Sequence, residues 1–327
     1  MIYRQVGNSD LELSAIILGT WAIGGWMWGH TPENEAVKAI RSAIDHGVNT
    51  IDTAPLYGRG RSEVIVGKAV KSMSRDKIRL LTKFGVLWNS NKAQTAYSIS
   101  DENGKKVNIS YHSGKESIIR ECEESLRRMD TEYIDLYQMH FYDPNTPMDD
   151  TFEAVNKLVE QGKVRHVGVC NLMMEDLNNA RQLSDIQSIQ VPYNMLNRMI
   201  EDELVPLCQE KNTGILAYSP LARGLLTGKI KPGHKFNTGD HRAEDQYFSD
   251  SAIKNIEDTL DQIRIMADEK GVTSAQLVLR WTLEQPGISA VLAGARNPSQ
   301  AKENAMALDF AFDSSDADRL NEFLKQE

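Results

Sequence analysis

The sequence predicts a single (β/α)8 barrel, and three observations lead to this prediction. About eight short runs rich in β-branched residues alternate with amphipathic stretches along the 327 residues. Most of these runs are apolar without strict alternation, which is typical of parallel strands that helices cover. No Pro/Gly/Ser-rich linker and no block of charge divides the chain, so we expect one domain over residues 1–327. An open doubly wound sheet is the alternative.

The strands are expected in a regular order along the chain. In sequence they are Ser14–Leu18, Asn49–Asp52, Arg79–Lys83, Tyr133–His140, Val164–Val169, Ser188–Val191, Ile215–Tyr218 and Ala290–Ala293. Helical patterns lie between them, for example over Glu35–Ile44 and Lys115–Arg128, where apolar residues recur every three or four positions. Each such stretch therefore has one face that can cover the strand before it.

Three connections exceed the usual few residues: Trp21–Pro32, Phe84–Gly114 and Pro220–Ser251. Each follows a strand, so each is expected at the barrel face where active sites are built. The middle connection is polar and rich in Asn, Ser and Lys. It is predicted to be a mobile lid or a substrate wall, with a disordered segment as the alternative.

Composition excludes several classes of function. The net charge is −9 and the basic residues are scattered, so the sequence does not predict binding to nucleic acid or to an anionic membrane. The N-terminus lacks the apolar core of a signal peptide and no long apolar stretch occurs, so a cytoplasmic protein is expected. Three cysteines in separate segments, Cys122, Cys170 and Cys208, suit neither a disulfide framework nor a Cys-x-x-Cys site.

Polar residues at strand ends are the strongest sign of chemistry. Asp52, Lys83 and His140 close the second, third and fourth strands, and Tyr57 follows Asp52 closely. In a barrel these ends converge on one mouth. Hydride addition to a carbonyl builds charge on its oxygen, so Tyr57 is expected to donate the proton, with Lys83 lowering its pKa. Asp52 would hold the lysine, and His140 would orient the carbonyl.

Each of these residues also has a simpler interpretation. Asp52 and Lys83 could form an ordinary buried ion pair, Tyr57 could be a loop aromatic and His140 a core histidine. Their joint position at successive strand ends favours a functional site. Metal ligation by Asp52 and His140 lacks the close His/Asp/Glu spacing of a specific metal site, so no metal is expected.

Several motifs in one order resemble a known family. They are Leu18-Gly-Thr-Trp21, Asp52-Thr-Ala-Pro-Leu-Tyr-Gly58, Thr82-Lys83, Asp135-Leu-Tyr-Gln-Met-His140, Gly168-Val-Cys-Asn171, Gln190, Tyr218-Ser-Pro-Leu-Ala-Arg-Gly224 and Gly294-Ala-Arg-Asn-Pro-Ser-Gln300. Over nearly its whole length the chain resembles the aldo-keto reductases, closest to the bacterial branch that includes potassium-channel β-subunit-like members. In that family the residues that match Asp52, Tyr57, Lys83 and His140 form the catalytic tetrad.

The resemblance also implies where NADP(H) would bind. The implied positions are Thr20, Trp21, Asp52, Cys170, Asn171, Gln190, Tyr218, Ser219, Leu221, Arg223, Gly294, Arg296, Gln300 and Asn304. Tyr218 would stack on the nicotinamide, while Asn171 and Gln190 would hold its carboxamide. Cys170 replaces the usual serine and offers only a weak hydrogen-bonding thiol.

The phosphates are expected at two segments. Residues 219–223 would wrap the pyrophosphate, with Lys229 either adding charge there or lying in solvent. Arg296, Gln300 and Asn304 recur at four-residue spacing, which places them on one predicted helical face and favours NADP over NAD through the 2′-phosphate. Pro298 is expected at the first position of that helix.

The sequence thus predicts NADPH-dependent reduction of an aldehyde or ketone. Trp21, Tyr57, Trp88 and His140 are the expected substrate contacts, within an aromatic-rimmed pocket for a small carbonyl compound. The alternatives are an NADP-occupied regulatory subunit with slow turnover, and metal-dependent hydrolysis or isomerisation. A monomer or weak homo-oligomer is expected.

Overall fold

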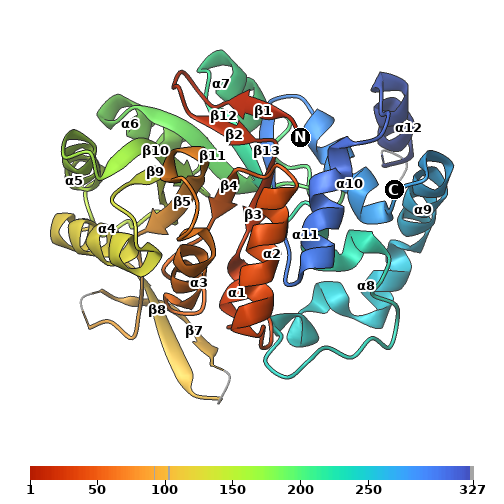
Figure 1. The fold of residues 1–327 in the computed structure, drawn as a ribbon, viewed down its shortest axis with the longest axis horizontal. Helices are drawn as coiled ribbons and strands as arrows, with labels where there is room; N and C mark the ends of the chain where they lie inside the picture. The colour runs from red at the N-terminus through yellow and green to blue at the C-terminus, as the bar shows by residue number, and fades with distance from the viewer. Residues whose placement is uncertain (92, 102–103, 325–327) are drawn as a thin grey trace.

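Eight parallel strands close into a barrel in the computed structural model, which describes residues 1–91, 93–101 and 104–324. The strands are β3 (Ile16–Gly19), β4 (Thr50–Asp52), β5 (Arg79–Phe84), β9 (Ile134–Met139), β10 (Val164–Cys170), β11 (Ile186–Pro192), β12 (Gly214–Tyr218) and β13 (Ile288–Gly294). Around the ring their order is β10-β11-β12-β13-β3-β4-β5-β9 (Figure 1). Each expected strand overlaps one of these, so the predicted (β/α)8 barrel is confirmed and the open sheet is wrong.

Helices surround the barrel. They are α1 (Trp21–Gly24), α2 (Glu33–Asp45), α3 (Arg61–Val70), α4 (Lys115–Met129), α5 (Met148–Glu160), α6 (Met174–Leu183), α7 (Leu204–Glu210), α8 (Asp250–Asn255), α9 (Glu257–Lys270), α10 (Ser274–Glu284), α11 (Pro298–Ala305) and α12 (Ser314–Leu324). The helical patterns expected at Glu35–Ile44 and Lys115–Arg128 lie within α2 and α4. In the described part of the chain, no helix combines the length and apolarity needed to cross a bilayer.

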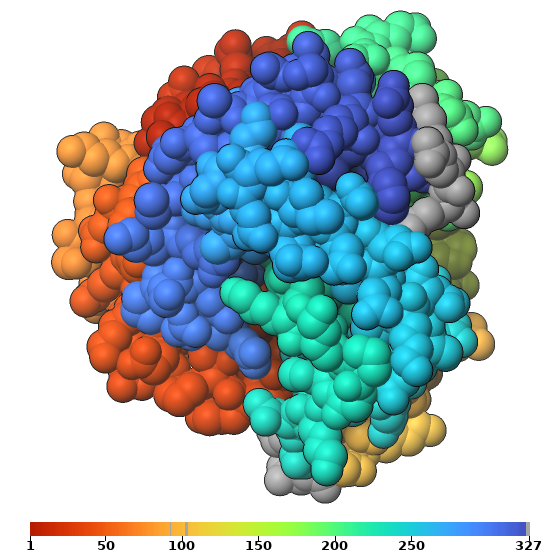
Figure 2. All heavy atoms as spheres, turned by 90° about the vertical axis from the view of Figure 1, so that its right-hand side faces the viewer, coloured from red at the N-terminus to blue at the C-terminus, as the bar shows by residue number. Residues whose placement is uncertain are grey.

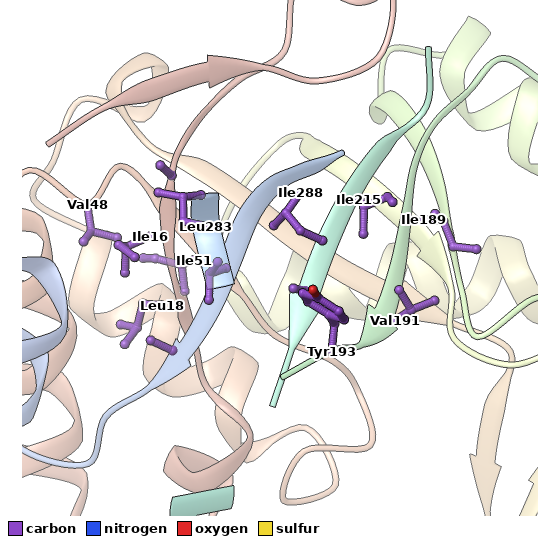
Figure 3. Close-up of a cluster of buried hydrophobic side chains, with 14 of the residues drawn as sticks. Ile16, Leu18, Val48, Ile51, Ile189, Val191, Tyr193, Ile215, Leu283 and Ile288 are labelled. Atoms are coloured by element: carbon purple, nitrogen blue, oxygen red, sulfur yellow. The ribbon is translucent and has the colours of Figure 1, made fainter. Parts of the chain in front are cut away.

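The strands have two apolar faces, which explains their lack of strict alternation. On β3, Ile16 and Leu18 pack into the large cluster between strands and helices, whereas Ile17 joins a smaller cluster inside the barrel. Figure 3 shows the outer cluster, where side chains of β3, β11, β12 and β13 lie with Leu283 of α10. Because both faces exclude water, apolar side chains lie on both, as the sequence pattern indicated, and the barrel-facing side also holds buried polar residues such as Gln138.

An N-terminal hairpin closes one end of the barrel. Strand β1 (Tyr3–Gln5) pairs antiparallel with β2 (Glu12–Ser14), and Val6, Leu11 and Leu13 complete the inner cluster. The prediction of one strand over Ser14–Leu18 was therefore partly wrong, because Ser14 belongs to the hairpin. In Figure 1 this hairpin lies at the opposite end of the barrel from β7 and β8.

The connection Phe84–Gly114 forms a small antiparallel sheet. Its strands, β6 (Val86–Trp88), β7 (Thr95–Ser100) and β8 (Lys106–Tyr111), have the order β6-β8-β7. Trp26 and three apolar residues of this sheet form a separate buried cluster, and Trp26 Nε1 donates to the Ser100 carbonyl oxygen at 3.3 Å. The described part of this connection thus forms an ordered sheet with its own buried cluster, so the disordered alternative is wrong for it.

The segment after β12 crosses to the loop after β3. It contains α8 and three 3-10 helices, η2 (Ala222–Thr227), η3 (His241–Glu244) and η4 (Gln246–Phe248). Asp240 forms an isolated antiparallel bridge with Trp28, and the His241 amide donates to the Met27 carbonyl oxygen at 2.9 Å. Figure 2 shows the teal part of this segment meeting blue C-terminal and red-orange N-terminal atoms. Two long connections therefore meet at the barrel mouth.

Candidate active site

The ammonium of Lys83 lies at the centre of the expected site. Its Nζ donates to Asp52 Oδ1 at 2.6 Å, to the Thr53 carbonyl oxygen at 2.9 Å and to the Tyr57 hydroxyl at 3.2 Å. Asp52 ends β4, Tyr57 lies in the turn after it, and Lys83 is on the adjacent strand β5. Lys83 and Asp52 are each 1% exposed, so solvent does not screen their ion pair.

His140 joins this group from the end of β9. Its ring lies edge-on to the Tyr57 ring, with centroids 6.0 Å apart, and its amide donates to the Phe84 carbonyl oxygen at 3.0 Å. Burial, and secondarily the Lys83 ammonium, hold the pKa of His140 well below its ordinary value. The imidazole is therefore neutral near pH 7. Among the described residues, no group of three His, Cys, Asp or Glu side chains could hold a metal ion.

The pKa of Tyr57 departs from the expectation. Burial raises it to about 12, while the Lys83 ammonium lowers it only in part. Lys83 lowers the pKa of Tyr57, as expected, but desolvation of the phenolate raises this pKa by more. The phenol is thus fully protonated at neutral pH, which suits a proton donor better than a base.

Two buried glutamines complete the surroundings of Asp52. Asp52 Oδ2 accepts from Gln190 Nε2 at 2.9 Å and from Gln138 Nε2 at 3.1 Å. Gln190 was expected at the site, whereas Gln138 was missed by the sequence reasoning. Its position two residues before His140 was the available signal, since residues i and i+2 of a strand share a face.

Asn171 links His140 to Tyr218 through two hydrogen bonds. Asn171 Nδ2 donates to the His140 carbonyl oxygen at 3.0 Å, and Asn171 Oδ1 accepts from the Tyr218 hydroxyl at 2.9 Å. Asn171 has φ +56°, a left-handed conformation that asparagine tolerates better than most residues. Burial raises the pKa of the neighbouring Cys170 thiol to about 12, so this cysteine is a neutral thiol.

The positions expected at the pyrophosphate are Ser219, Leu221 and Arg223, and they form one turn after β12. Ser219 and Arg223 have φ +54° and +56°, so the turn is strained. The Arg223 guanidinium pairs with Asp245 at 2.5 Å. Lys229 pairs with Glu303 at 3.6 Å, and its side chain is largely exposed.

The positions expected at the 2′-phosphate surround the start of α11. Arg296 precedes the helix, so the expectation that it shares a helical face with Gln300 and Asn304 was wrong; the extended backbone of Asn297, φ −147° and ψ 163°, separates it from the helix. Gln300 Oε1 still accepts from the Arg296 amide at 2.9 Å. Asn304 is buried and donates to the Gly294 carbonyl oxygen at 3.0 Å. Pro298 lies in the first turn of α11, as predicted.

The remaining expected positions, Thr20, Trp21 and Trp88, differ in how near their side chains lie to Tyr57 and His140. Thr20 is fully buried, and its hydroxyl donates to the Asp52 carbonyl oxygen at 2.8 Å, so its side chain faces the protein. Trp21 stacks on the Tyr57 ring with centroids 6.1 Å apart, so it lies next to the residues that surround Lys83. Trp88 packs in the cluster of the small sheet, and no described ring contact joins it to Tyr57 or His140.

His241 was not expected at the mouth. Its ring stacks on Trp21 with centroids 5.3 Å apart, and its Nδ1 lies 2.6 Å from the Met27 carbonyl oxygen. Trp28 packs edge-on against the same ring, and the buried Trp28 Nε1 has no described partner. Because His241 lies within a long connection, no helix or strand pattern in the sequence predicts its position. Its place at the mouth is seen only where the connections after β3 and β12 meet.

Comparison with known proteins finds relatives over the whole chain. A family model described as Aldo/keto reductase family matches residues 15–325. Aldo-keto reductase YhdN of Bacillus subtilis (strain 168) is 36% identical over 327 residues, covering 99% of this chain and 94% of that protein. The NADH-specific methylglyoxal reductase of Escherichia coli (strain K12) is 35% identical over 322 residues, covering 97% of this chain and 96% of that protein.

Solved structures resemble this one equally broadly. The glycerol dehydrogenase AKR11B4 from Gluconobacter oxydans superposes with a TM-score of 0.87 at 34% identity, covering 99% of this chain and 95% of that chain. An aldo/keto reductase from Klebsiella pneumoniae, solved in complex with NADP and acetate, gives a TM-score of 0.74 at 30% identity, covering 99% of this chain and 96% of that chain.

Proposed function

The chain belongs to the aldo/keto reductase family, and from that premise we propose that it reversibly reduces an aldehyde or ketone with a hydride from NADPH. One observation carries the proposal: Lys83 Nζ contacts both Asp52 and the Tyr57 hydroxyl in a buried site that His140 borders. A proton donor, a charge that tunes it and a neutral hydrogen-bond donor are the groups that carbonyl reduction requires.

Tyr57 is the proposed general acid. When bound, the reduced nicotinamide supplies the hydride. The Tyr57 phenol, protonated at neutral pH, then gives its proton to the carbonyl oxygen, and Lys83 stabilises the phenolate that remains. Asp52 holds the lysine in place. His140 is neutral, so it stabilises the developing oxyanion through a ring N–H rather than through a full charge.

The residues at the mouth fit a nicotinamide dinucleotide. Tyr218 offers a ring to stack on, and Gln190 retains a carbonyl oxygen that can accept from a carboxamide. Ser219, Leu221 and Arg223 are proposed to hold the pyrophosphate. Their turn has strained backbone, a feature that is often found at ligand-binding sites.

NADPH is proposed over NADH because Arg296 lies beside the start of α11. A guanidinium and a helix N-terminus both favour an anion such as a 2′-phosphate. The Klebsiella pneumoniae structure with NADP supports this choice, whereas the Escherichia coli relative is named NADH-specific. Direct comparison of the two cofactors is therefore part of the test.

A small carbonyl compound is the proposed substrate. Trp21 stacks on Tyr57, Trp28 packs edge-on against Trp21, and Trp88 lies in the small sheet after β5. The comparisons do not favour the alternative of a regulatory subunit, since the relatives named above are reductases and a dehydrogenase.

Loss of NADPH absorbance tests the proposal across a panel of aliphatic, aromatic and sugar aldehydes. Multiple rapid turnovers with at least one aldehyde are expected. The same panel with NADH measures cofactor preference. Binding of either cofactor without turnover on any carbonyl would instead favour the regulatory alternative.

A further inference from the structure

Gln138 is a buried polar residue to which the proposed mechanism gives no role. It lies in β9, is fully buried, and shares the barrel-facing side of the strand with His140. Its Nε2 donates to Asp52 Oδ2 at 3.1 Å, and its Oε1 accepts from Gln190 Nε2 at 3.2 Å. Both ends of this amide therefore bind groups of the site.

The Asp52 carboxylate dictates which way the two amides turn. Its Oδ1 accepts from Lys83, and its Oδ2 accepts from Gln138 and Gln190. A carboxylate in an ion pair can only accept, so each glutamine must direct its NH2 group toward it. Turning either amide over would place two oxygens against each other in a site without water screening.

Gln138 adds a second constraint on Gln190. Gln190 Nε2 lies between two acceptors, Asp52 Oδ2 and Gln138 Oε1. The Gln190 carbonyl oxygen is thus directed away from both, and no donor among the described residues reaches it. This oxygen is the atom of the Gln190 amide that remains for a ligand.

We propose that Gln138 is a positioning residue: it locks Gln190 so that the Gln190 carbonyl oxygen accepts a hydrogen bond from the carboxamide NH2 of the cofactor. The inference rests on the proposed function, because it requires a nicotinamide cofactor. It adds that the orientation of this contact is set from β9, through a residue that does not itself touch the ligand. Gln138 also contributes one of the donors that hold Asp52 against Lys83.

Two substitutions separate positioning from packing. Gln138→Met keeps the length of the side chain but removes both hydrogen bonds. It is expected to weaken NADP⁺ binding about fivefold, the size of one neutral hydrogen bond, at every pH. NADP⁺ affinity is measured by quenching of tryptophan fluorescence, with NAD⁺ titrated in parallel, and folding is checked by thermal unfolding.

Gln138→Glu makes the effect depend on pH. Two carboxyl groups this close cannot both ionise easily, so the introduced carboxyl stays protonated in mild acid. In that form it donates to Asp52 and accepts from Gln190, as the amide does. As pH rises it loses its proton and repels Asp52. NADP⁺ affinity relative to wild type should therefore be near normal in mild acid and fall in mild alkali.

Gln187→Met is the matched control. Gln187 is another buried glutamine of β11, but it lies at the other end of the strand, where its Oε1 accepts from the Asn8 amide at 3.0 Å. This variant should lose thermal stability without losing NADP⁺ affinity. If both Gln138 variants bind NADP⁺ like wild type at every pH, the positioning role is overturned. If wild type itself binds neither NADP⁺ nor NAD⁺, the proposed function fails first.

Discussion

The hydroxyl of Tyr57 is subject to two opposing influences, and their balance decides what it can do. Burial opposes the phenolate, and Lys83, 3.2 Å away, favours it, with burial the stronger. The phenol is consequently a proton donor at neutral pH. Alcohol oxidation needs the phenolate as base, so oxidation should accelerate as pH rises toward about 12, whereas reduction should not.

The first prediction concerns a substitution that removes only the proposed proton donor, the hydroxyl of Tyr57. Tyr57→Phe should keep cofactor affinity and lower turnover by roughly 100-fold or more, because only the proton donor is lost. Steady-state rates and a fluorescence titration of NADPH measure the two effects. Turnover close to wild type would contradict the role of Tyr57.

The second prediction concerns a substitution that removes the positive charge of Lys83. Lys83→Met should raise the pKa of Tyr57 further, so alcohol oxidation should suffer at least as much as aldehyde reduction and recover only at higher pH. Asp52 would lose its ion-pair partner in a buried site, so circular dichroism must first establish that the variant folds. Normal oxidation at neutral pH would show that Lys83 does not tune the tyrosine.

At the scale of elements, turns and helices position charged groups that do not lie on the barrel strands. The turn between β13 and α11 presents Arg296, whose guanidinium donates to the Trp28 carbonyl oxygen at 3.2 Å. Helix α4 contributes Glu121, which is buried and accepts from the Gly85 amide just after β5. Both contacts are made between elements that are distant in sequence.

The third prediction concerns that turn. Arg296→Ala should weaken NADPH binding by about 1.5–3 kcal/mol and NADH binding much less, because the proposed charge-assisted contact would reach only the 2′-phosphate, which NADH lacks. Dissociation constants for both cofactors measure it. Equal weakening of the two would show that Arg296 acts elsewhere.

The fourth prediction concerns Glu121. Burial raises its pKa from an ordinary 4.5 to about 7. The native state therefore holds a proton between these values that the unfolded chain has released, so this group lowers stability as pH rises through that window. Glu121→Gln can still accept from the Gly85 amide and donate to Ser117. Its unfolding midpoint should fall less than that of wild type between about pH 5 and about pH 8, and an identical fall would refute the assignment.

At the scale of the whole molecule, closure of the barrel assembles the site. Asp52, Lys83, His140, Gln190 and Tyr218 come from strands around the ring, and the connections after β3 and β12 meet over its mouth. The N-terminal hairpin fills the other end. Cofactor binding should therefore stabilise the ring as a whole rather than one part of it.

The fifth prediction follows from this arrangement. Thermal unfolding monitored by calorimetry should give one transition, and saturating NADP⁺ should raise its midpoint by mass action without splitting it. Wild type heated without nucleotide is the control. A first transition that NADP⁺ leaves unmoved would indicate a second folding unit and contradict the prediction of a single domain.

Some properties of this protein follow from its sequence alone, because they depend on neighbours along the chain. The eight barrel strands and the polar residues at their ends were predictable, since a short run of β-branched apolar residues and the residue that ends it are local features. The strands of the segment after β5 were missed: Thr95–Ser100 is mostly exposed, and it is held by pairing with β8 and by the contact of Trp26 with Ser100.

Only the tertiary structure decided the electrostatics of the site. The pKa of Tyr57 depends on how much water the closed barrel excludes, which no local pattern reports. The sequence could place Gln138 on the strand face of His140, but only the closed barrel shows that Asp52, 86 positions away, lies 3.1 Å from its amide. The orientation of a buried amide is set by the acceptors around it, and here those acceptors are brought together only when strands from different parts of the chain close into a ring.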